Sequence, residues 1–294
     1  MQLGLGTAQF GMDYGISNRD GQTQPEETAR ILAHAEVVGI RVLDTAALYG
    51  DSEAVLGAVL KPGHSFRVVT KTPAFGGSRM TRFETSALKV SFEQSLARLR
   101  QDRLYSLLVH AAGDLLRPEG ELLWAAMTAL KREKLVEKIG VSVYSGDEID
   151  SILDRFQPDL VQVPLNVLDQ RLVMSGHLTR MKALFVEIHA RSVFLQGLLL
   201  MDQSSLPARF SPFRAELDRI RAFCRRHGIS PLVMAMAFVK SIPEIDVAIV
   251  GVARLDHLKD IVTACELEAP GVDSYASLAC NDERLVNPSL WRLQ

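Results

Sequence analysis

Short apolar segments rich in β-branched residues alternate along this chain with longer amphipathic segments. The short segments predict strands near residues 2–8, 40–44, 66–71, 104–110, 137–143, 159–163, 184–190 and 246–250. The longer segments predict helices near residues 25–38, 52–60, 82–100, 119–134, 147–155, 171–182, 213–228 and 254–265, and a further helix near 231–241. Because the strands are apolar on both faces, we expect parallel strands that helices cover.

This alternation predicts an α/β fold. Eight strand–helix units favour a (β/α)8 TIM barrel that forms a single domain over residues 1–294. A doubly wound open sheet is the alternative arrangement of alternating strands and helices. The pattern ends near residue 268, so we expect an irregular C-terminal tail from there.

Composition and charge narrow the class of protein. The 33 basic and 35 acidic residues nearly balance, which indicates neither a nucleic-acid partner nor a membrane surface. The cysteines, Cys224, Cys265 and Cys280, are widely spaced, which favours a reducing compartment over a disulfide framework. No signal peptide and no membrane-spanning run is recognised, so a cytoplasmic location is expected. The histidines lack paired ligand spacing, so no metal site is expected, and the oligomeric state is not readable.

Polar side chains follow three successive predicted strands. Asp44, Lys71 and His110 each stand where an apolar strand ends. Because barrel enzymes place their chemistry at the carboxyl ends of the strands, we expect these side chains to converge at one mouth. Tyr49 lies in the loop after Asp44 and can reach the same place. Each residue alone is most simply a cap, an ion pair or a packing residue, but the four together predict a catalytic group, here named the tetrad.

The tetrad suits the reduction of a carbonyl group. Hydride transfer to a carbonyl needs a proton donor, and a phenol with an ordinary pKa of ~10 is a weak one. We expect the Lys71 cation to lower the pKa of Tyr49, the proton donor. Asp44 would keep Lys71 charged, because an unpaired buried ammonium group is costly. His110 would hydrogen-bond the carbonyl oxygen and polarise it.

These residues and their order resemble the aldo-keto reductase superfamily. The similar segments are Gly4-Leu5-Gly6-Thr7, Asp44-Thr45-Ala46-Ala47-Leu48-Tyr49-Gly50, Val69-Thr70-Lys71, Leu108-Val109-His110, Gly140-Val141-Ser142 and Gln162. The resemblance implies an NAD(P)H-dependent oxidoreductase that reduces an aldehyde or ketone to an alcohol. The cofactor would be NADP (as NADPH), with NAD as the other possibility, and the substrate would be a small carbonyl compound.

The resemblance also implies the residues that bind the cofactor. Ser142 and Gln162 would hold the nicotinamide carboxamide, and Gly197 would allow close approach of the backbone to the pyrophosphate. Arg254, His257 and Asp260 would lie at the adenosine end, where a helix N-terminus suits a phosphate. The other residues implied at the cofactor are Gly6, Thr7, Arg191, Phe194, Leu195, Gln196, Val250 and Gly251.

Two positions depart from the usual family pattern. Val143 stands where asparagine is usual, and Arg191 stands where many members have a tyrosine that stacks on the nicotinamide. A planar guanidinium can stack in the same way. Alternatively, Arg191 can pair with Glu187 or bind the pyrophosphate. The basic set at the 2′-phosphate position is reduced to Arg254 and His257, which leaves the choice between NADPH and NADH open.

Some of these residues are also compatible with other functions. A cofactor-sensing binding protein with weak turnover would keep the pocket, and an aldolase or isomerase would use Lys71 as a Schiff-base amine. The Gly4-x-Gly6 pair is not a Rossmann fingerprint, because Gln9 replaces the third glycine. Some aromatic and apolar residues can form a substrate wall or simply pack; they are Phe10, Met12, Tyr14, Phe75 and Trp291.

Overall fold

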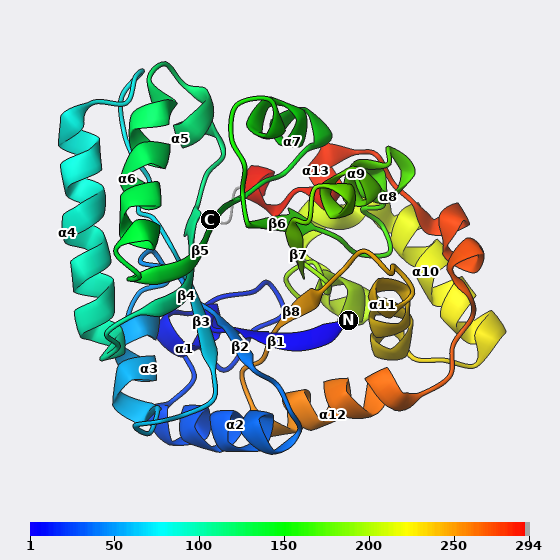
Figure 1. The fold of residues 1–294 in the computed structure, drawn as a ribbon. Helices are drawn as coiled ribbons and strands as arrows, with labels where there is room; N and C mark the ends of the chain where they lie inside the picture. Colours follow the sequence, from blue (N-terminus) through cyan, green and yellow to red (C-terminus); the bar gives the residue numbers. More distant parts are fainter. Residues whose placement is uncertain (292–294) are drawn as a thin grey trace.

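Eight parallel strands close into a barrel in the computed structural model, which describes residues 1–291 apart from the side chains of residues 203, 272 and 273 (Figure 1). The strands are β1 (Gln2–Gly6), β2 (Val42–Asp44), β3 (Arg67–Lys71), β4 (Leu104–Val109), β5 (Val136–Ser142), β6 (Leu160–Pro164), β7 (Glu187–Arg191) and β8 (Val247–Gly251). Each strand pairs with the next, and β8 pairs with β1. The predicted (β/α)8 barrel is therefore confirmed, and the open sheet is excluded.

Helices surround the barrel (Figure 1). The α-helices are α1 (Ala8–Gly11), α2 (Pro25–Val37), α3 (Ser52–Val59), α4 (Arg82–Leu99), α5 (Gly113–Leu116), α6 (Gly120–Arg132), α7 (Gly146–Leu153), α8 (Arg171–Met174), α9 (His177–Ala183), α10 (Arg214–His227), α11 (Pro231–Lys240), α12 (Leu255–Glu266) and α13 (Glu283–Val286). The 3-10 helices are η1 (Leu198–Leu200), η2 (Gln203–Ser205), η3 (Ala208–Phe213), η4 (Val272–Leu278) and η5 (Pro288–Leu290). Among the described residues, none of these helices is both long and apolar enough to cross a bilayer.

Local signals account for most element boundaries. Thr81 begins α4 with a capping box, in which its side chain and that of Glu84 bond each other's backbone N–H groups. The predicted helix 171–182 is instead two helices, because Gly176 adopts a φ of +77° between them. The predicted strand 184–190 begins only at residue 187, because Phe185 turns the chain with a φ of +59°.

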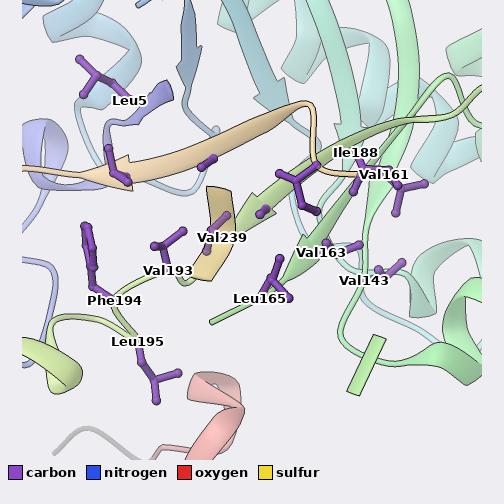
Figure 2. Packing of buried hydrophobic residues seen from close by; sticks show 14 of the residues in the cluster. Leu5, Val143, Val161, Val163, Leu165, Ile188, Val193, Phe194, Leu195 and Val239 are labelled. Carbon is purple, nitrogen blue, oxygen red and sulfur yellow. The ribbon is translucent and has the colours of Figure 1, made fainter. Parts of the chain in front are cut away.

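The main hydrophobic core lies between the strands and the helices. Figure 2 shows part of it, including Val161 and Ile188, which are paired residues on β6 and β7. A smaller apolar cluster joins residues of different strands; it consists of Val42, Val69, Tyr105, Leu108, Leu160, Val247 and Ile249. This packing holds the strand ends in fixed positions relative to one another.

A polar network lies near the amino ends of β4, β5 and β7. Glu187 accepts hydrogen bonds from the Tyr105 hydroxyl (2.6 Å) and from Lys138, and one of its oxygens lies 2.6 Å from Nε2 of the fully buried His189. Burial alone would raise the pKa of Glu187, but these hydrogen bonds hold it at about 2. The partners of Glu187 therefore lie in this network, and Glu187 is not the partner of Arg191.

The C-terminal tail is fastened to the segment that follows β6. The Gln170 side chain donates to the Tyr275 carbonyl (2.8 Å), and the Cys280 N–H donates to the Leu168 carbonyl (2.8 Å). The tail was expected to be irregular, but it contains η4, α13 and η5. Its buried Trp291 packs edge-on against Phe210, with ring centroids 4.9 Å apart.

Candidate active site

A cavity of about 770 Å³ lies at the carboxyl ends of the strands. Asp44, Tyr49 and His110 line it, whereas Lys71 lies beneath the lining with 1% of its side chain exposed. Most of the predicted cofactor residues also line it: Gly6, Thr7, Ser142, Gln162, Arg191, Phe194, Gln196, Gly197, Gly251, Arg254, His257 and Asp260. The structure therefore gathers residues from the first to the last strand around one space.

Two predicted cofactor residues do not line the cavity. The side chains of Leu195 and Val250 are buried in the hydrophobic core, 0% and 1% exposed. Val250 precedes Gly251 on β8, and successive strand residues point to opposite faces, so its side chain is directed away from the cavity. Neither side chain is placed to contact a ligand there.

Lys71 and Asp44 form a buried ion pair at the ends of β2 and β3. Lys71 Nζ lies 2.8 Å and 2.7 Å from the two carboxylate oxygens of Asp44, and it also donates to the Thr45 carbonyl (2.9 Å). These three contacts engage all three N–H donors of an ammonium group. Burial lowers the pKa of Lys71, and the Asp44 carboxylate opposes that effect.

Tyr49 lies between the ion pair and His110. Lys71 Nζ is 5.0 Å from the centroid of the Tyr49 ring, a distance at which a cation is attracted to the ring face. The rings of Tyr49 and His110 meet edge to face, with centroids 5.9 Å apart. The structure therefore brings the four tetrad residues together at one mouth, as the strand ends predicted.

The pKa of Tyr49 shifts in the direction opposite to our expectation. Burial, followed by the charge of Asp44, raises this pKa above its ordinary value. Burial disfavours the charged phenolate, and the nearby Asp44 carboxylate repels it, so both effects outweigh the opposing positive charge of Arg191. Tyr49 is therefore fully protonated at neutral pH, as a proton donor must be.

His110 is neutral at physiological pH. Burial, followed by the positive charge of Lys71, lowers its pKa to about 4. Its Nδ1 is buried without a hydrogen-bond partner, and its backbone N–H donates to the Thr72 hydroxyl (3.2 Å). A neutral imidazole at this place can donate one hydrogen bond without carrying charge.

Gln162 extends the ion pair across the barrel. Its Nε2 donates to Asp44 Oδ1 (2.7 Å), so β6 supports the carboxylate of β2. Its Oε1 is buried and has no partner, although the side chain lines the cavity. An unpaired buried acceptor is costly, so this atom is suited to an N–H donor of a bound molecule.

Arg191 is held by the end of β5 rather than by an acidic residue. It donates to the Ser142 hydroxyl (3.3 Å) and to the Val143 carbonyl (2.9 Å). Its guanidinium lies 4.1 Å from the centroid of the Tyr144 ring. Arg191 thus stacks on an aromatic ring of the protein itself, and its positive charge acts on Tyr49 and on His110.

Tyr14 is the only one of the proposed wall residues to line the cavity. Burial, followed by the neighbouring Tyr49, raises the pKa of Tyr14 to about 12, and Gln196 hydrogen-bonds it. Phe10 is instead fully buried in the core. The sequence did not lead us to Tyr144, which also lines the cavity. Its position just after the strand that ends in Ser142 was the signal that could have identified it.

Within the part of the chain that the structure describes, no group of three or more His, Cys, Asp or Glu side chains is placed to hold a metal ion.

Comparison with known proteins agrees with this architecture. Residues 2–276 match the model of the Aldo/keto reductase family. A 6-dehydroglucose reductase from Novosphingobium aromaticivorans is 27% identical over 286 residues, which cover 90% of this chain and 89% of that protein.

Two solved structures share the fold. The holo form of an aldo-keto reductase from Bacillus halodurans superimposes with a TM-score of 0.74 at 20% identity, covering 99% of this chain and 94% of the other. A glycerol dehydrogenase from Gluconobacter oxydans gives 0.70 at 20% identity, covering 99% and 93%.

Proposed function

Because this chain belongs to the aldo/keto reductase family, we propose that it reduces an aldehyde or ketone to an alcohol with NAD(P)H, and that Tyr49 donates the proton. The observation that carries the proposal is the buried Lys71–Asp44 pair beneath the ring of Tyr49 at the wall of the cavity. An ion pair this buried costs desolvation energy, so its presence at the cavity is better explained by function than by stability.

Three observations support a nicotinamide dinucleotide as the molecule that binds in this cavity. The unpaired Gln162 Oε1 would accept the carboxamide N–H, and the Ser142 hydroxyl, which accepts from Arg191, retains its own proton to donate to the carboxamide oxygen. Gly251 also lines the cavity, and a Cβ added there would lie 2.7 Å from the Gln9 amide and would displace that side chain. When bound, the reduced dinucleotide would supply the hydride.

The protein's own residues would then supply the proton to the carbonyl oxygen. His110 and Tyr49 would hydrogen-bond the carbonyl oxygen, and this polarises the carbonyl carbon. As negative charge develops on that oxygen, Tyr49 transfers its phenolic proton to it. The Lys71 ammonium, 5.0 Å from the Tyr49 ring, stabilises the phenolate that remains. Asp44 keeps Lys71 protonated and fixed throughout.

The contacts of Lys71 argue against a Schiff-base enzyme. A nucleophilic lysine must be neutral and reach the substrate. Lys71 instead donates all three hydrogen bonds to Asp44 and Thr45 and is 1% exposed.

The test is Tyr49→Phe, assayed by oxidation of NADPH and of NADH with a panel of aldehydes and ketones. We expect turnover to fall by on the order of 10²-fold or more while cofactor affinity stays nearly unchanged, because only the proton is lost. The matched control is Tyr275→Phe, which removes a buried hydroxyl that has no partner. A Tyr49→Phe enzyme with wild-type turnover would overturn the mechanism. A wild-type protein that binds the cofactor but reduces nothing would favour the sensor instead.

A further inference from the structure

Acidic side chains gather at one end of the cavity, near the start of α12. Asp20, Arg254, His257 and Asp260 line this end, and Glu27 lies behind it at the start of α12. Helices α2 and α12 are neighbours, which brings Glu27 to this place (Figure 1). This inference rests on the proposed function, since it concerns which nicotinamide dinucleotide the cavity accepts.

The Glu27 carboxylate accepts a hydrogen bond from a backbone N–H group that a bound phosphate could otherwise use. The N–H groups of a helix N-terminus attract anions. Here the first N–H of α12, that of Leu255, donates to Glu27 Oε1 (2.7 Å). The other oxygen of Glu27 accepts from Arg30 (2.6 Å), so the carboxylate is held from both sides. The Glu27 carboxylate of the protein itself therefore lies at the N-terminus of α12, where an anion would bind.

Asp20 forms an ion pair with Arg254 at the same end of the cavity. Arg254 Nη1 lies 3.2 Å from Asp20 Oδ2, with both side chains more than half exposed. Such an exposed pair is weak, but the carboxylate remains beside any group that Arg254 would bind. The loop that carries Asp20 is fastened nearby, because the Thr23 hydroxyl donates to the Ala253 carbonyl (3.1 Å).

His257 adds no positive charge to balance these carboxylates at neutral pH. Burial, followed by the charge of Arg254, lowers its pKa, and the nearby Asp20, Asp256 and Asp260 do not reverse this. A neutral imidazole and four carboxylates, counting Glu27, thus lie around Arg254 at this end. Arg19 also lines the cavity, but its guanidinium donates to the Ser205 hydroxyl (3.3 Å).

We propose that Asp20 and Glu27 make this enzyme selective for NADH over NADPH. A carboxylate accepts a hydrogen bond from a ribose 2′-hydroxyl, as in other dinucleotide sites, and repels a 2′-phosphate. A phosphate monoester carries a charge of about −1.5 to −2 at neutral pH. At about 6 Å in a water-like medium, its repulsion by one carboxylate corresponds to roughly a 10-fold loss of affinity.

The test measures binding without chemistry. Isothermal titration calorimetry compares ADP-ribose with its 2′-phosphorylated form on the wild-type protein, on Asp20→Asn and on Glu27→Gln. Both substitutions keep shape and an oxygen acceptor and remove one negative charge. We expect the wild type to favour ADP-ribose by more than about 10-fold, and each variant to reduce that preference by about 10-fold. Glu26→Gln is the control, because it removes a charge from the exposed neighbouring residue of α2.

The outcomes separate the two proposals. Tighter binding of the 2′-phosphorylated fragment by the wild type overturns the selectivity but leaves the reductase proposal standing. A preference that Asp20→Asn and Glu27→Gln leave unchanged also overturns it. Failure of both fragments to bind overturns the selectivity and the proposed function together.

Discussion

Replacing Lys71 with methionine should cost this protein much more stability than the loss of one hydrogen-bonding side chain normally does. Methionine has a similar length, so packing changes little. Asp44, however, is 4% exposed and would keep only the Gln162 amide as a side-chain partner. Leaving one charge of a buried pair without its partner costs roughly 3–5 kcal/mol.

Urea denaturation monitored by circular dichroism measures this cost. The matched control is Lys131→Met, because Lys131 also binds both oxygens of an aspartate, Asp159, but at a partly exposed site (39% and 28%). That surface pair should contribute under about 1 kcal/mol. The double variant Asp44→Asn/Lys71→Met removes both charges, so it should recover most of the stability and none of the activity.

Two results would refute this reasoning. A loss below about 1 kcal/mol for Lys71→Met would mean that the pair is solvated. A double variant that is less stable than Lys71→Met would mean that the orphaned charge of Asp44 is not the cause.

The remaining predictions concern titration and charge. Because the pKa of His110 is about 4, kcat/KM should show no limb near pH 6.5, and a limb there that disappears in His110→Gln would contradict a neutral imidazole. The pKa of Glu187 is about 2, below its ordinary value of 4.5, so its stabilising effect should be present above pH 4.5 and lost as the pH falls toward 2; Glu187→Gln should flatten this part of a pH–stability curve. Arg191→Met should shift the ratio of oxidised to reduced cofactor affinity toward the oxidised, cationic form by about 1 kcal/mol, measured by fluorescence titration, whereas an equal loss for both forms would indicate a phosphate clamp.

The barrel and the positions of the tetrad could be predicted because both depend on local patterns. Apolar runs mark the strands, and a polar residue at the end of a parallel strand faces the same mouth as its neighbours. Asp44, Lys71 and His110 needed no further information.

The rest depends on contacts that the sequence does not display. Gln162 bonds Asp44 from a position 118 residues away, and no periodicity reveals that pairing. The direction of the Tyr49 pKa shift depends on how deeply the fold buries the phenol and on how near Asp44 lies, and neither is visible in the sequence. The stack of Arg191 on Tyr144 likewise joins the end of β7 to the segment after β5, although β6 lies between these strands in the barrel.

The pairing of β1 with β8 has a consequence for how the protein folds. These strands meet from Gln2↔Val247 to Gly6↔Gly251, so closing the barrel joins segments about 245 residues apart, which is entropically costly and slow. Asp44, Lys71 and His110 come from strands that can assemble earlier, whereas the pair between Asp20 and Arg254 crosses this seam. A half-assembled barrel would hold the tetrad but would lack the end of the cavity where we propose that the adenosine binds. On our proposal, a nucleotide would bind only the closed barrel, and by mass action it should draw the last strand into place.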